Sequence, residues 1–93
     1  MGYISHMEVV EIKNIVRKDT AVLYRRTFAG EAVLAYAADN TQSRRIEFVL
    51  EHTATSGILV EVKFLDTPDY PLIPVVEELK KHLTALDRGG KLP

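Results

Sequence analysis

The stretch that decides the fold reads GILVEVKFLDTPDYPLIPVVEELKKHLTALDRGG and covers residues 57–90. Apolar residues alternate along residues 58–65, which is the period of a β-strand. Over residues 74–87 they recur every three or four positions instead, which is the period of an amphipathic helix. The intervening residues 66–71 contain two prolines, which cannot lie in a central strand. A strand, a corner and one C-terminal helix are therefore predicted for this part of the chain.

Four more runs of β character precede this stretch, at residues 8–16, 20–28, 31–38 and 44–51. The pair Ala29-Gly30 predicts a short turn between the second and third runs, because glycine adopts a positive φ without steric cost. The predicted fold is α+β: a five-stranded, mainly antiparallel, meander-like sheet with one C-terminal helix packed on one face. The strand order and register stay open at this level.

The helix is expected to dock on the sheet through an apolar stripe made of Val76, Leu79, Leu83 and Leu86. Its partners are apolar residues of one parity in the fourth and fifth runs, namely Ile46, Phe48, Val60 and Val62. This packing covers one side of the sheet only.

Length and composition indicate one ordinary globular domain. The chain has 93 residues, of which 46% are hydrophobic and 27% charged, with a net charge of −1. That charge gives no general attraction to nucleic acid or to an anionic membrane. The chain contains no Cys, which fits a reducing compartment, and it shows neither a membrane-spanning run nor a secretory signal. A cytoplasmic protein with no membrane association and no cofactor is therefore expected.

The single domain is expected to cover residues 7–88. The periodic pattern begins only after Met7, and His6-Met7 is a pair that cloning often leaves before a start codon. Residues 1–6 are therefore interpreted either as such a remnant or as native sequence. Gly89 favours a helix C-cap, and residues 89–93 are expected to form a flexible tail.

Paired basic residues form one candidate site, which would bind the phosphate of a nucleic acid or nucleotide. Its candidate residues are Arg25, Arg26, Arg44 and Arg45. A five-stranded meander would bring Arg17-Lys18 and Arg44-Arg45 to one end of the sheet. Four aspartates would gather at the same end: Asp19, Asp39, Asp66 and Asp69. A solvated rim of ion pairs is the favoured interpretation, so weak or absent nucleic-acid binding is predicted.

No catalytic or metal-binding group is predicted. Glu51, His52 and Ser56 lie near one turn, but a hydrolytic site needs an oriented base and shelter from water. A short hairpin turn supplies neither. His52 and His82 lack the short spacing of a metal-binding pair. An enzyme is therefore not expected.

The third run has no polar face, which leaves an apolar row on the side of the sheet away from the helix. This row consists of Leu23, Val33, Ala35, Ala37, Val49 and Leu59. Because one helix covers only one face, the row needs a partner, or the sheet curls into a partial barrel that buries it. The expected function is a small non-catalytic interaction or regulatory module that forms a homodimer through its sheet or binds another protein.

Overall fold

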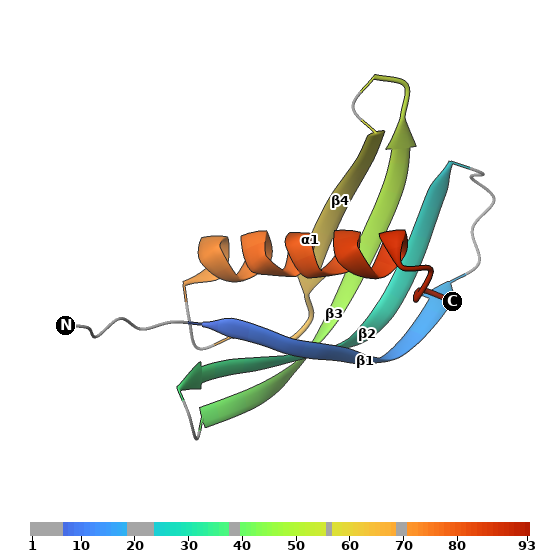
Figure 1. Ribbon diagram of the computed structural model, residues 1–93. Coiled ribbons are helices and arrows are strands. Elements are labelled where there is room, and N and C mark those ends of the chain that lie inside the picture. Colours follow the sequence, from blue (N-terminus) through green and yellow to red (C-terminus); the bar gives the residue numbers. More distant parts are fainter. Residues whose placement is uncertain (1–6, 19–23, 38–39, 56, 69–70) are drawn as a thin grey trace.

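The computed structural model describes residues 7–18, 24–37, 40–55, 57–68 and 71–93. This part of the chain forms four strands and one helix: β1 (Glu8–Lys18), β2 (Arg25–Ala37), β3 (Asn40–Thr53), β4 (Gly57–Phe64) and α1 (Leu72–Arg88). The strands pair in chain order, each antiparallel to the next. The helix crosses the strands on one side of the sheet (Figure 1). The α+β class, the antiparallel sheet and the C-terminal helix are confirmed.

The sheet has four strands where five were predicted, because the predicted turn at Ala29-Gly30 lies inside β2. Gly30 faces an irregularity in β1, where the register shifts between Lys13 and Val16. Asn14, in this bulge, has a φ of 55°. A Cβ on Gly30 would lie 3.3 Å from the backbone oxygen of Lys13. The glycine thus marks a close approach of two backbones beside a β-bulge, which is the other common role of glycine in a strand.

The continuous β2 also corrects the predicted gathering of basic pairs at one end of the sheet. Arg17 pairs with Phe28, which pairs in turn with Phe48, and Phe48 lies four residues along β3 from Arg44. Four strand residues span about 13 Å. Arg17-Lys18 and Arg44-Arg45 therefore occupy different parts of the sheet. Asp19, Asp39 and Asp69, which were expected among them, lie outside the described residues.

The core lies between α1 and the sheet, where the rings of Phe28 and Phe48 stack with centroids 5.0 Å apart. The predicted core positions Leu79, Leu83, Ile46, Phe48 and Val60 are all buried. Val75, rather than the predicted Val76, completes the buried stripe of the helix. Val62 and Leu86 pack partly buried at the margin of the core.

The helix begins and ends as its terminal residues dictate. Pro71 and Pro74 lie before and within the first turn, where a missing N–H costs no helical hydrogen bond. At the other end Gly90 adopts a φ of 67°, and the N–H of Lys91 donates to the oxygen of Leu86 at 2.9 Å. Leu92 then packs against the core.

Candidate interaction surface

The face of the sheet opposite α1 is here called the open face. Its residues in β2, β3 and β4 are Thr27, Ala29, Glu31, Val33, Ala35, Thr41, Ser43, Arg45, Glu47, Val49, Glu51, Leu59, Glu61 and Lys63. Charged and apolar side chains alternate on this face. Within the described strands, β1 and β4 are the two edges and do not pair with each other, so the sheet does not close into a barrel.

The residues predicted for self-association share the open face but do not form one continuous patch. Val33, Ala35 and Val49 are half-buried, and Leu59 is 49% exposed. Val49 lies opposite Thr27, which is six residues, or about 20 Å, along β2 from Val33. The expected row relied on a hairpin at Gly30, which would have folded these positions together. Only the backbone of Ala37 is described, and Leu23 lies outside the described residues.

Ion pairs cover much of the open face. Lys18 of β1 donates a hydrogen bond to Glu47, and this bond and the charge of Lys18 hold the pKa of the Glu47 carboxyl below its ordinary value. Arg25 lies within 4.0 Å of Glu51 and within 3.9 Å of Glu61. The charges on this face are therefore largely balanced by neighbours of opposite sign.

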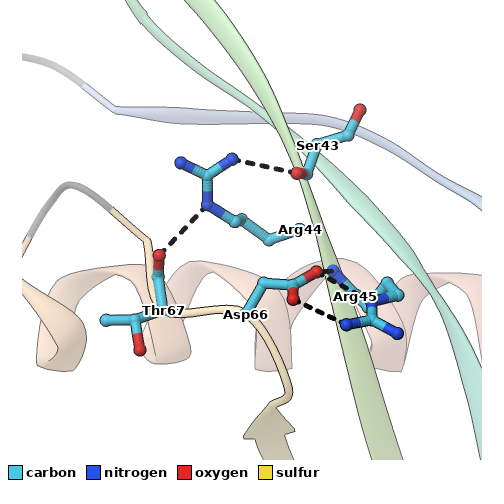
Figure 2. A network of polar contacts seen from close by, with 5 residues as sticks. All are labelled: Ser43, Arg44, Arg45, Asp66 and Thr67. Carbon is cyan, nitrogen blue, oxygen red and sulfur yellow. Dashed lines mark hydrogen bonds and ion pairs between the residues drawn. The ribbon is translucent and has the colours of Figure 1, made fainter.

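Arg45 and Asp66 form the most complete ion pair of the described chain (Figure 2). The guanidinium of Arg45 donates to both carboxylate oxygens of Asp66 at 2.9 Å, and its backbone N–H adds a third bond at 3.1 Å. These hydrogen bonds lower the pKa of Asp66 to about 2 and raise that of Arg45. The carboxylate is thus held in its charged form by a single residue.

The other three candidate anion-binding arginines also have acceptors within the chain, so the four do not converge on one surface. Arg44 donates to the backbone oxygens of Ser43 and Thr67 (Figure 2) and to the side chain of Gln42. As neighbours in a strand, Arg44 and Arg45 project to opposite faces. Arg26 lies 2.9 Å from Asp87, near the end of α1, while Arg25 faces the carboxylates described above.

The edge strand β4 is more regular than the opposite edge, and a groove opens beside it. Its eight residues pair with β3 without a register shift, whereas β1 has two such shifts. The groove measures about 450 Å³ and is lined by Thr27, Glu47, Val49, Glu61, Val62, Lys63, Val76 and Lys80. Sequence reasoning missed this surface, because the alternation of a strand does not reveal whether the strand lies at an edge.

A family comparison covers most of the chain, since the model of a protein family of unknown function matches residues 4–88. The chain belongs to this family. No curated protein and no solved structure matches it. The function of this family member is therefore argued from its own surface.

The described part of the chain shows no grouping of residues that would hold a metal ion. It contains no cluster of three or more His, Asp or Glu side chains suited to a metal, and all of its buried side chains are apolar. His52 is exposed on the last turn of β3, and Ser56 lies outside the described residues. No described helix is both long enough and apolar enough to span a membrane.

Proposed function

We propose that this chain is a small, non-catalytic interaction or regulatory module that self-associates through its sheet. The observation that carries the proposal is where its exposed apolar side chains lie. Among the described residues, four of the seven large exposed ones belong to β4, its last turn and the start of α1: Leu59, Leu65, Leu72 and Ile73. A monomer leaves them in water, whereas a two-fold dimer through this region would bury them twice.

An interaction role fits the electrostatics of the groove better than a catalytic one. A general base works best with a pKa near the working pH. Glu47 lines the groove, and Lys18 shifts its pKa downward, which makes the carboxylate a weaker base. The groove is also open along the surface of the sheet, so it does not exclude water from a reacting group. The absence of Cys agrees with action in the cytoplasm.

The test is the molar mass of the purified protein, measured by light scattering after size exclusion and by sedimentation from low micromolar to several hundred micromolar. A mass that rises to twice that of one chain is expected. Ala35→Glu places a charge on the open face and tests whether the interface includes that part of β2. A protein that remains monomeric at several hundred micromolar would contradict the proposal.

The alternative is a nucleic-acid or nucleotide-phosphate binding module that uses Arg25, Arg26, Arg44 and Arg45. It has less support, because each of these guanidinium groups lies beside an acceptor of its own chain. A mobility shift with mixed oligonucleotides tests it directly. Micromolar binding that weakens steeply with salt would favour the alternative, because release of counterions is the signature of phosphate contacts.

A further inference from the structure

The two edges of the sheet differ in their suitability for pairing with another strand. β1 is irregular: its register shifts twice, and Asn14 has a positive φ. Bulges of this kind keep an edge from accepting a further strand. β4 is straight in register over eight residues, and within the described chain no strand pairs with its outer side. The edge open to pairing is therefore that of β4.

The charges on β4 are complementary to themselves in one antiparallel register. Glu61 and Lys63 lie on the open face, two residues apart, on either side of Val62. If two β4 strands pair antiparallel around a two-fold axis at Val62, Glu61 of each copy lies opposite Lys63 of the partner subunit. The symmetry forms this ion pair twice.

Neighbouring registers are unfavourable for the same reason. An axis one residue earlier would place the two Glu61 side chains opposite each other, and an axis one residue later would do the same to the two Lys63 side chains. Like charges directly opposite each other destabilise a strand pair. The pattern of β4 therefore selects a single register as well as a partner.

The apolar residues agree with this register on both faces. On the open face, Leu59 and Leu65, which are 49% and 46% exposed, come opposite each other across the axis. On the helix side, Val60 meets Phe64 of the partner subunit, and the two Val62 side chains meet at the axis. These side chains of the partner would enter the groove beside Val62 and Val76. Leu72 is four residues before Val76 on the same face of α1, so the partner would cover it too.

We infer that the partner in self-association is a second copy of this chain, added edge to edge at β4 in the register centred on Val62. The inference rests on the proposed function. The product is a continuous eight-stranded antiparallel sheet. Its two-fold axis is perpendicular to the sheet, so both copies of α1 lie on the same face.

Charge reversal tests the register. Glu61→Lys and Lys63→Glu each create two like-charge pairs, and each is expected to weaken the dimer about ten-fold or more. The double variant Glu61→Lys/Lys63→Glu reverses both partners and is expected to restore the wild-type dissociation constant. Glu11→Lys on the β1 edge is the matched control and should leave that constant unchanged. Circular dichroism of each variant confirms that it remains folded.

Amide hydrogen exchange gives a second readout of the edge. Exchange of amides in residues 58–64 should slow as the protein concentration rises through the dissociation constant, while exchange in β1 should not change. A dimer that withstands both single reversals and is dissociated by Ala35→Glu would show pairing through the open face. That result would overturn the edge register and leave the proposed self-association intact. A protein that stays monomeric at every concentration would overturn both.

Discussion

Arg45 and Asp66 are bound to each other by three hydrogen bonds, two from the guanidinium and one from the backbone N–H of Arg45. The pair connects β3 to the residue that follows the last turn of β4 and so fixes the point where the chain leaves the sheet for the corner before α1 (Figure 2). Its position makes it the best internal probe of how this corner responds to pH.

The Arg45–Asp66 pair should make the stability of the fold depend on acid. The folded pKa of Asp66 is about 2, below its ordinary value of 3.8, so folding favours the charged carboxylate. The stabilisation is complete above about pH 4 and is lost as the pH falls toward 2. Urea unfolding of the wild type and of Asp66→Asn should therefore differ at pH 6 and converge near about pH 2. A difference that is constant over this range would show that the Asp66 charge contributes nothing.

Leu79 is fully buried at the centre of the helix stripe, and its truncation should be costly. Leu79→Ala is expected to lower the free energy of unfolding by about 2–5 kcal/mol, because it removes buried methyl groups and leaves a cavity. Denaturant unfolding measures the loss. The exposed Lys81→Ala on the same helix is the control and should change stability by less than about 0.5 kcal/mol. A comparably small loss for Leu79→Ala would refute the packing of α1.

Gly30 should tolerate a side chain poorly. Its Cβ position lies 3.3 Å from the oxygen of Lys13 and 3.4 Å from Cγ1 of Ile15, so a branched side chain would push β1 away. We expect Gly30→Val to destabilise the fold by about 1–3 kcal/mol through overpacking. Ala29→Val places the same side chain one residue earlier, on the open face, and should cost less. Equal thermal stability of the two variants would mean that the bulge in β1 yields without cost.

The contact between Arg26 and Asp87 should hold the end of α1 against β2. The two side chains are 21% and 20% exposed and lie 2.9 Å apart. Removal of either leaves a half-buried charge without its partner, so Arg26→Ala and Asp87→Ala should each cost about 1–3 kcal/mol. The double variant should cost less than the sum of the two. The exposed Arg88→Ala serves as the control, and strict additivity of the two losses would show that the pair is not coupled.

The sequence determined the parts of the fold that depend on local periodicity. The alternation of β4 and the three- and four-residue spacing of α1 are each set within one segment, because side chains point in directions that the backbone geometry dictates. The proline-rich corner separated them for an equally local reason, since proline cannot donate to a strand ladder. The core positions Leu79, Leu83, Ile46 and Phe48 followed from these periods.

Only the tertiary structure decided which segments are neighbours. Gly30 has the same local freedom in a turn and beside a bulge, and the choice depends on Asn14 and Ile15 of another strand. Joining two predicted strands into β2 then separated Val33 from Val49, dispersed the expected apolar row and placed Arg45 beside Asp66. Contacts of this kind form between residues far apart in the chain. Their free energy comes from packing and charge across strands, which no single segment encodes.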